Sequence, residues 1–351
     1  APPKTEDLLR IDTLEVEIGY GLIPMVDAHQ GGDLLDRISI IRKQLALDMG
    51  FIVPAIRIRD NVRLRPNEYV VKIKGLVVAG GELMPDSLMA INPGFLTDDI
   101  EGFETVEPAF HLKARWIIPS LKETAEAKGF TVVEPTAVLA THLTELIKGN
   151  AAEIVTRQDV QHLLETLKQD QPALVDGVVP DLVTLPAVHK IIQLLLSERV
   201  PIRDLGTIME TVSDFAPSTK DPEVLAEYCR ISLRRRISDM LKDDQGQIHC
   251  FTLSPTVEQL LTDAVQNTKQ GIMVILPPEV SEKLIQETNR QTDILSTGGH
   301  HPVCLTAPSV RLAFRRLVET ALPQLTVVSF NEIHRDVSLI STGMVELNHD
   351  S

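Results

Sequence analysis

The chain has 351 residues, with 34 Lys and Arg against 49 Asp and Glu, so its formal net charge at pH 7 is −15. A charge of this sign excludes a generally basic nucleic-acid binder. The hydrophobic share of 43% and the charged share of 24% exclude a disordered or collagen-like chain. At this length, two or three globular domains are expected.

Hydropathy and cysteine content indicate the cellular compartment of the chain. No apolar run approaches the roughly 20 residues that a membrane-spanning helix needs, so we expect a soluble chain. Cys229, Cys250 and Cys304 form no CxxC pair, which favours a reducing compartment such as the cytoplasm. The sequence begins Ala-Pro-Pro-Lys without Met or a signal region, so we expect a piece of a longer protein that starts with a linker at residues 1–10.

The first 154 residues predict an α/β or α+β module with an insertion. Residues 14–18 alternate apolar and acidic side chains as a half-buried strand does, and apolar residues recur at helical spacing from Leu34 to Leu47. From about residue 86 to 134 the pattern is loop-rich, which indicates an inserted subdomain. The other expected elements are strands at 52–58, 69–78, 116–118 and 130–133, a helix at 121–128 and a turn at Gly80-Gly81.

The rest of the chain changes from helices to alternating strands and helices. Helical periodicity dominates from Pro135 to about Lys242, where Pro201 and Asp221-Pro222 are expected to open helices. Beyond Lys242, strands alternate with helices, which predicts βαβ units and a partly parallel sheet. The expected strands are 248–253, 272–276, 303–306 and 325–330, and the expected helices are 256–266, 278–295 and 309–322.

Sequence motifs of nucleotide binding and of hydrolysis are absent. A phosphate loop needs a glycine-rich turn between a strand and a helix, whereas prolines follow the strands that end near Leu253, Leu276 and Thr306. The sequence has no GxSxG and no HExxH motif. A triad assembled from distant residues is not excluded, but no residue can be named for one.

Two histidine pairs are weak candidates for metal ligands. His249-Cys250 and His300-His301 offer suitable donor atoms, but neither has a partner pair at the spacing of a zinc finger. Adjacent residues of an extended segment also point in opposite directions. Solvated loops, with no metal and no cofactor, are the favoured interpretation.

Arg230, Arg234, Arg235 and Arg236 form the one basic cluster, on a predicted helix. The cluster is either a site for phosphate or anionic lipid, or a solvated helix face that pairs with nearby acids. The strongly acidic character of the chain favours the solvated face. The overall negative charge also suits the docking of basic partners through long-range steering.

Two short segments could contribute to a docking groove. In Glu107-Pro108-Ala109-Phe110, a Phe stands beside a carboxylate in a proline-shaped loop, as an apolar anchor with a polar rim would. The local pattern alone nevertheless favours a core position for Phe110. In Ala140-Thr141-His142, Thr141 is either a helix-interior residue or part of a groove between the first two domains.

Eight segments together carry a family resemblance. They are Glu17 to Asp27, Arg37 to Arg42, Gly50 to Pro54, Ile58 to Asn61, Met89 to Gly94, Glu107 to Phe110, Ala140 to Leu143 and Val200 to Leu205. In this order, and over essentially the whole chain, they resemble the cytoplasmic domain of the FlhA family of bacterial type III export-gate proteins. The segment 302–333 looks more like the flagellar branch of that family than the injectisome branch.

The resemblance implies α/β plus α architecture with four compact subdomains, on the cytoplasmic face of the inner membrane. It also implies a ring of nine copies below the export channel. The implied boundaries are 1–12 for a linker from the membrane part, 13–85 with 135–154 for a first α/β subdomain, 86–134 for a small inserted α/β subdomain, 155–240 for a helical subdomain, 241–346 for a C-terminal α/β subdomain and 347–351 for a tail.

The implied function is docking, with no known catalytic role. Members receive export chaperones that carry filament, cap or junction proteins, help to order their delivery, and work with an ATPase complex and a companion gate protein. The chaperone enters a hydrophobic dimple between the first two subdomains. The matching positions here are Glu107, Pro108, Phe110 and Thr141, with Val133, Val138 and Ala140 as walls. Many members carry Asp where this chain has Glu107, so the carboxylate reaches one methylene further here.

Two other functions stay open. The chain resembles, less closely, the equivalent domain of a virulence injectisome, which differs in its cargo. A cytoplasmic α/β enzyme with an interdomain cleft is the alternative from another class, and only the βαβ pattern and the chain length support it.

Overall fold

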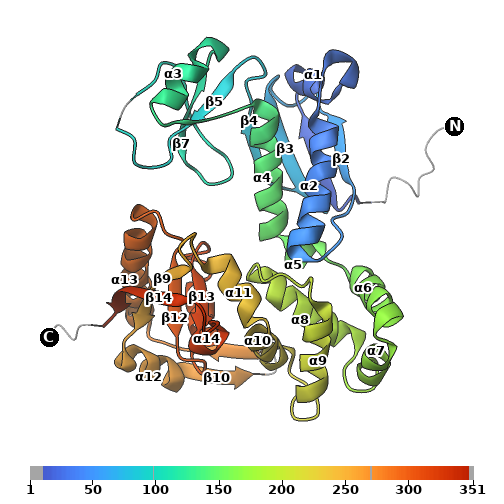
Figure 1. The fold of residues 1–351 in the computed structure, drawn as a ribbon, viewed down its shortest axis with the longest axis vertical. Coiled ribbons are helices and arrows are strands. Elements are labelled where there is room, and N and C mark those ends of the chain that lie inside the picture. The colour runs from blue at the N-terminus through green and yellow to red at the C-terminus, as the bar shows by residue number, and fades with distance from the viewer. Residues whose placement is uncertain (1–10, 98, 269–270, 348–351) are drawn as a thin grey trace. The chain divides into compact units, whose positions relative to one another are not determined.

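The computed structural model describes residues 11–97, 99–268 and 271–347, which form two compact units (Figure 1). One unit is Ala1–Leu163 with Pro201–Arg203, and the other is Leu164–Val200 with Asp204–Ser351. The linker expected at residues 1–10 lies outside the described residues. In the described part of the chain, no helix has both the length and the apolar character that crossing a membrane requires.

The first unit begins with a four-stranded sheet in the order β2-β1-β3-β4. Strand β1 is parallel to β2 and antiparallel to β3. Helices α2 and α4 pack against each other and share one core with the sheet, which includes Val16, Ile38 and Leu139. The bounds are β1 Leu14–Ile18, α1 Ile23–Val26, α2 Leu34–Met49, β2 Ile56–Asp60, β3 Glu68–Ile73, β4 Leu76–Glu82 and α4 Pro135–Gly149.

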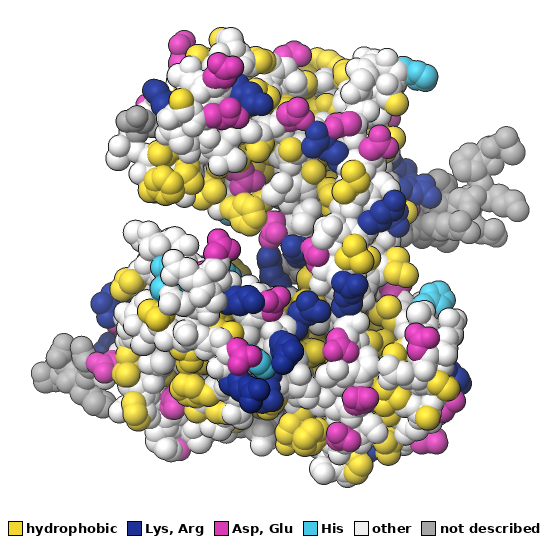
Figure 2. All heavy atoms as spheres, in the orientation of Figure 1, with side chains coloured by type: hydrophobic (Ala, Val, Ile, Leu, Met, Phe, Trp, Pro, Cys, Tyr) yellow, Lys and Arg dark blue, Asp and Glu magenta, His cyan; other side chains and the backbone are white. Residues whose placement is uncertain are grey.

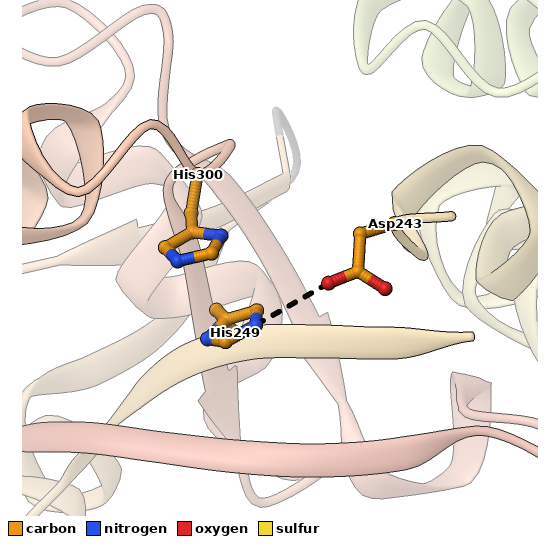
Figure 3. A group of neighbouring side chains, drawn as sticks. All are labelled: Asp243, His249 and His300. Atoms are coloured by element: carbon orange, nitrogen blue, oxygen red, sulfur yellow. Dashed lines mark ion pairs between the residues drawn. The ribbon is translucent and has the colours of Figure 1, made fainter. Parts of the chain in front are cut away.

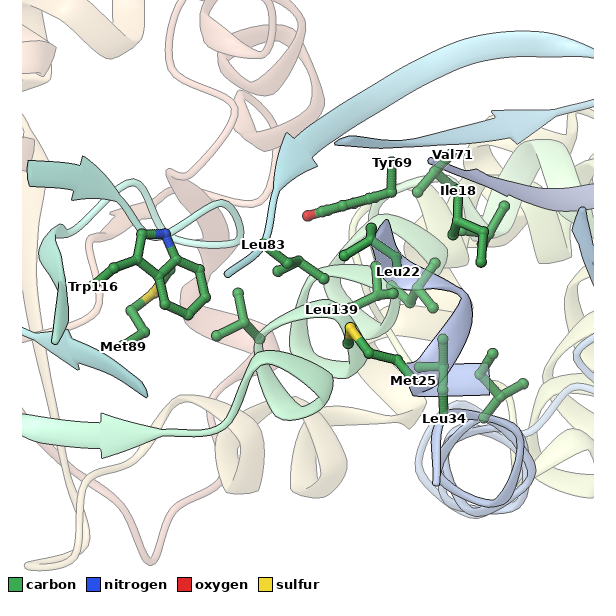
Figure 4. Packing of buried hydrophobic residues seen from close by; sticks show 14 of the residues in the cluster. Ile18, Leu22, Met25, Leu34, Tyr69, Val71, Leu83, Met89, Trp116 and Leu139 are labelled. Atoms are coloured by element: carbon green, nitrogen blue, oxygen red, sulfur yellow. The ribbon is translucent and has the colours of Figure 1, made fainter. Parts of the chain in front are cut away.

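The expected insertion forms a second, antiparallel sheet in the order β6-β7-β5-β8. Trp116 and Met89, on its strands β7 and β5, reach the core of the first sheet, near Leu83 and Tyr69 (Figure 4). The insertion is therefore tied to the first sheet by buried apolar contacts. The bounds are β5 Leu88–Ile91, β6 Phe103–Val106, β7 Lys113–Ile117, α3 Lys122–Ala127 and β8 Thr131–Val133.

Gly80 and Gly81 lie inside β4, so the turn expected there is wrong. The chain reverses at Lys74-Gly75, where φ is 50° and 81°. A Cβ at Gly81 would lie 2.7 Å from the hydroxyl of Tyr69. Glycine is required at this position by the close approach of a core side chain and not by a turn.

Helices follow one another from Ala151 to Leu241, as the periodicity predicts. Asp221 caps α10 by accepting the N–H of Glu223, but Pro201 opens no helix, because α9 begins four residues later with Asp204 as its cap. The bounds are α5 Ala151–Ile154, α6 Arg157–Asp170, α7 Pro172–Val178, α8 Leu185–Ser197, α9 Leu205–Phe215, α10 Pro222–Ser232 and α11 Arg234–Leu241.

The interpretation of the basic cluster as a solvated helix face is wrong for Arg230. The helix breaks at Leu233, so Arg230 lies on α10 and the other three arginines lie on α11. Arg230 is 2% exposed and forms an ion pair with Glu332, whereas Arg234, Arg235 and Arg236 are exposed.

The C-terminal sheet is parallel throughout, in the order β13-β12-β9-β14. Strand β12 is buried at every position, which explains the apolar run Val303-Cys304-Leu305 before Thr306. Strand β14 was not predicted, because its side chains are largely exposed and lack an alternating pattern. The bounds are β9 Gln247–Leu253, α12 Pro255–Ala264, β10 Val265–Thr268, β11 Gly271–Val274, α13 Pro278–Thr297, β12 Val303–Thr306, α14 Arg311–Val318, β13 Thr326–Ser329 and β14 Ser338–Val345.

Candidate functional site

Glu107 organises the loop that joins β6 to β7. Its backbone N–H donates to the carbonyl of Leu112 at 2.8 Å, and its carbonyl accepts the N–H of His111 at 2.9 Å. Its carboxylate accepts the N–H groups of Ala109 and Phe110 at 2.8 and 2.7 Å. Both carboxylate oxygens thus bond to the loop's own backbone, and the residue is only 3% exposed. Glu107 shapes the loop and offers little surface to a partner.

The loop presents Phe110 to solvent. This residue is 57% exposed, so the core position favoured by the local pattern is wrong. Its backbone N–H donates to the Glu107 carboxylate, which holds this part of the loop in place. Hydrophobic side chains gather along the margin of the inserted part in Figure 2. The other large apolar residues exposed in this part are Phe95, Phe103, Val106 and Ile118.

A buried polar pair lies within electrostatic range of the Glu107 carboxylate. The hydroxyl of Tyr69, on β3, and Nδ1 of His142, on α4, are hydrogen-bonded at 2.7 Å. Burial raises the pKa of Tyr69, and the charge of Glu107 raises it further. Burial lowers the pKa of His142, against the opposing effect of Glu107, so this imidazole is neutral at pH 7. The Glu107 carboxylate therefore acts electrostatically on His142, which lies on the same helix as Thr141.

Some of the remaining predicted site residues lie at the surface, and the others lie in the core or pack against it. Thr141 is exposed on α4, and Ala140 and Pro108 are half-buried. Val138 is 2% exposed inside the core, and the half-buried Val133 packs against that core. Phe110 and Thr141 are therefore accessible to a partner, whereas Val138 can act only by supporting them.

A pocket of about 660 Å³ lies within the inserted part, and none of the seven predicted site residues lines it. Its walls come from several separate segments of the insertion, so no single local pattern indicates it. The lining residues are Asn92, Leu96, Thr97, Asp99, Glu104, Thr105, Val106, Lys113, Ala114, Arg115 and Phe130.

Comparison with known proteins places the chain in a family. Residues 1–338 match the model of the FHIPEP family. The chain belongs to that family. It is 42% identical over 347 residues to the flagellar biosynthesis protein FlhA of Bacillus subtilis (strain 168), which confirms the resemblance seen in the sequence. The alignment covers 99% of this chain and 51% of the relative, so the chain spans about half the length of the relatives it matches.

Solved structures share the fold. The Chlamydia pneumoniae CdsV protein superposes with a TM-score of 0.86 at 26% identity, over 96% of this chain and 98% of that one. CdsV in its complex with CdsO gives 0.85 at 27% identity with the same coverage. A cryo-EM structure of nonameric EPEC SctV-C gives 0.80 at 21% identity, over 96% of this chain and 99% of that one, and shows the fold alone. The multi-subdomain α/β plus α class is thereby confirmed.

Proposed function

We propose that this chain is the docking platform of a flagellar type III protein export gate. It receives export chaperones loaded with filament, cap or junction proteins and helps to order their delivery to the channel. The observation that carries the proposal is the exposed Phe110, which a buried carboxylate fixes on the loop between β6 and β7. An apolar side chain held in place beforehand loses little conformational entropy when a partner covers it.

Each predicted residue has a role in this proposal. Phe110 is the apolar anchor, and Thr141 offers a hydroxyl on its rim. Glu107 and Pro108 hold the loop, while Val133, Val138 and Ala140 shape the surface beneath the partner. The carboxylate of Glu107 thus acts through Phe110 and makes no bond of its own to the chaperone.

The wider assembly is part of the same proposal. The chain lies at the cytoplasmic face of the inner membrane and is joined to a membrane part through a linker at residues 1–12. Nine copies form a ring, a proposal supported by the shared fold with the nonameric EPEC protein. An ATPase complex and a companion gate protein are further partners, and the complex of CdsV with CdsO is a precedent for a protein partner on this fold. The four subdomain boundaries stay those predicted from the sequence.

The equivalent domain of a virulence injectisome is the second candidate. Identity of 42% to a flagellar biosynthesis protein favours the flagellar cargo. Among the residues that it describes, the structure adds no candidate catalytic residue to the enzyme hypothesis. We expect no catalysis and no nucleic-acid partner.

The test is a calorimetric titration of the chain with a flagellar chaperone carrying its filament-type substrate. We expect saturable binding that Phe110→Ala weakens by about 1–3 kcal/mol, as truncation of an anchor does. Phe103→Ala is the matched control, because Phe103 is 73% exposed on the strand that leads into the same loop. This control should bind as the unchanged chain does.

The outcomes separate the alternatives. Unchanged melting of both variants confirms that a loss of binding comes from the surface and not from misfolding. Equal loss in both variants would refute the anchor role of Phe110. Binding of injectisome chaperones alone would move the assignment to that branch, and binding of neither class would refute the docking function.

A further inference from the structure

A cluster of two histidines and one aspartate lies in the second unit. Of the residues that the structure describes, only Asp243, His249 and His300 form a group of three His, Cys, Asp or Glu residues suited to one metal ion. Their donor atoms all lie within 4.8 Å of one another. They come from three segments: the turn after α11, strand β9, and the loop between α13 and β12.

Local structure places each of the three side chains. One oxygen of Asp243 accepts the N–H groups of Gln245 and Gln247, both at 2.9 Å, which leaves its other oxygen to face His249 at 3.3 Å. His300 follows the end of α13 and donates its backbone N–H to the carbonyl of Leu295 at 2.9 Å. The backbone therefore orients the carboxylate and fixes the His300 backbone without using the donor atoms that face inward.

The neighbours of the two histidines point elsewhere. His301 Nε2 bonds with Oγ1 of Thr326 at 2.7 Å. Cys250, next to His249 on β9, is 1% exposed and lies in the core. One histidine of each sequence pair thus faces Asp243, as the alternation of side chains on extended segments predicts. Neither sequence pair indicated this cluster, because His249 and His300 belong to different pairs and Asp243 belongs to neither.

The rings of His249 and His300 stack with centroids 3.6 Å apart and an interplanar angle of 14°. Figure 3 shows a ring nitrogen of each histidine on the side that faces Asp243. The separation of 3.3 Å between His249 Nε2 and Asp243 Oδ2 is close to the roughly 3.3 Å between two ligands of a tetrahedral zinc ion with bonds of about 2.0–2.1 Å.

We propose that Asp243, His249 and His300 bind one divalent transition-metal ion of the zinc class. Two imidazole nitrogens and one carboxylate oxygen suit zinc, cobalt or nickel, whereas calcium and magnesium prefer oxygen ligands alone. A rotation of the His300 ring brings its nitrogen from the stack to the third ligand position. Water completes the fourth position, and the ion links the turn after α11, strand β9 and the loop before β12.

The test uses the whole 351-residue chain without a polyhistidine tag, titrated with zinc chloride by calorimetry. We expect one ion per chain, and a loss of affinity of at least about tenfold in His249→Ala and in His300→Ala. Asp243→Asn keeps an oxygen for the two backbone N–H groups and removes the charge, so it should also weaken binding. His29→Ala is the matched control, because His29 is exposed in the first unit and lies outside the cluster. It should bind zinc as the unchanged chain does.

Cobalt(II) provides a second readout that does not depend on stability. The unchanged chain should show the visible absorption of a cobalt ion with nitrogen and oxygen ligands, and His300→Gln should lose it while its circular dichroism is unchanged. Affinity of the unchanged chain weaker than about 1 mM would overturn the proposal. The proposal would also be overturned if both histidine variants bound zinc as tightly as the unchanged chain. The same holds if His29→Ala lost as much zinc affinity as they do.

Discussion

Arg311 and Glu198 form a paired hydrogen bond inside the second unit. Nη1 and Nη2 of Arg311 donate to the two carboxylate oxygens of Glu198 at 2.8 and 3.0 Å. The Arg311 side chain is 0% exposed, and its Nε also donates to Glu227 at 2.7 Å. Because Glu198 follows α8, Glu227 lies on α10 and Arg311 begins α14, one buried guanidinium ties the helical part to the C-terminal sheet region.

Replacing this arginine should destabilise the second unit strongly. Arg311→Met leaves two carboxylates without their shared partner in a buried site, so the free energy of unfolding should fall by about 3–5 kcal/mol. Urea unfolding followed by circular dichroism measures the change. The control is Arg335→Met, because the Arg335 side chain is 90% exposed. This substitution should lower the free energy of unfolding by less than about 1 kcal/mol. Similar losses in both variants would contradict the structural role of the buried pair.

The same cluster predicts a loss of stability in acid. Burial would raise the pKa of Glu198, but Arg230 and Arg311 outweigh it and lower this pKa from 4.5 to about 2. The folded carboxyl therefore binds its proton less readily than the unfolded one. Its contribution, at most about 3 kcal/mol, is present above pH 4.5 and is lost as the pH falls to about 2.

Unfolding midpoints measured between pH 6 and pH 2.5 test this dependence. The fall below pH 4.5 should be less steep in Glu198→Gln than in the unchanged chain, because the variant has no proton to take up at this site. Glu126→Gln, on the exposed surface of α3, should leave the slope unchanged. An unaltered slope in the Glu198 variant would disprove the assignment.

Glu107 should tolerate aspartate better than glutamine. A shorter carboxylate at the start of such a loop still accepts the N–H groups two and three residues on, as Asp does in Asx-turns. Glu107→Gln replaces one acceptor oxygen by a donor NH₂ group, so the hydrogen bond to the N–H of Ala109 or Phe110 is lost. The loss should lower the free energy of unfolding by about 1–3 kcal/mol. Chaperone titration together with melting should show near-normal binding for Glu107→Asp and weaker binding for Glu107→Gln. The reverse order would point to a direct bond from the longer carboxylate to the chaperone.

Gly50 should be harder to replace than Gly31. Both have positive φ, at 86° and 83°, so alanine strains the backbone by about 1–2 kcal/mol in either case. A Cβ at Gly50 would also lie 2.2 Å from the backbone nitrogen of Arg203, whereas nothing lies within 4 Å of one at Gly31. Thermal unfolding should therefore show a larger loss for Gly50→Ala. Equal losses would mean that the segment Pro201–Arg203 can move away from the end of α2 at little cost.

Periodicity along the chain was sufficient for most of the fold. The helix at α2, the helical stretch from α4 to α11 and the parallel sheet of β9, β12 and β13 were predicted because apolar spacing reflects which face of an element is buried. The same signal failed at β14 and at Gly80-Gly81. An exposed strand has no apolar alternation, and a glycine chosen for close packing looks like a glycine chosen for a turn.

The site depended on contacts between distant segments. The family resemblance pointed to Glu107, Phe110 and Thr141, but the local sequence placed Phe110 in the core. In the structure Phe110 is exposed, and Glu107 is buried with its carboxylate bonded to the backbone of the loop. His249 and His300 meet Asp243 only because strand β9 and two loops converge. Arg230 is buried where it pairs with Glu198 and Glu332, which lie far from it in the sequence. Local spacing records which side chains prefer to be buried, whereas charges and ligands are paired by the three-dimensional packing of segments far apart in the chain.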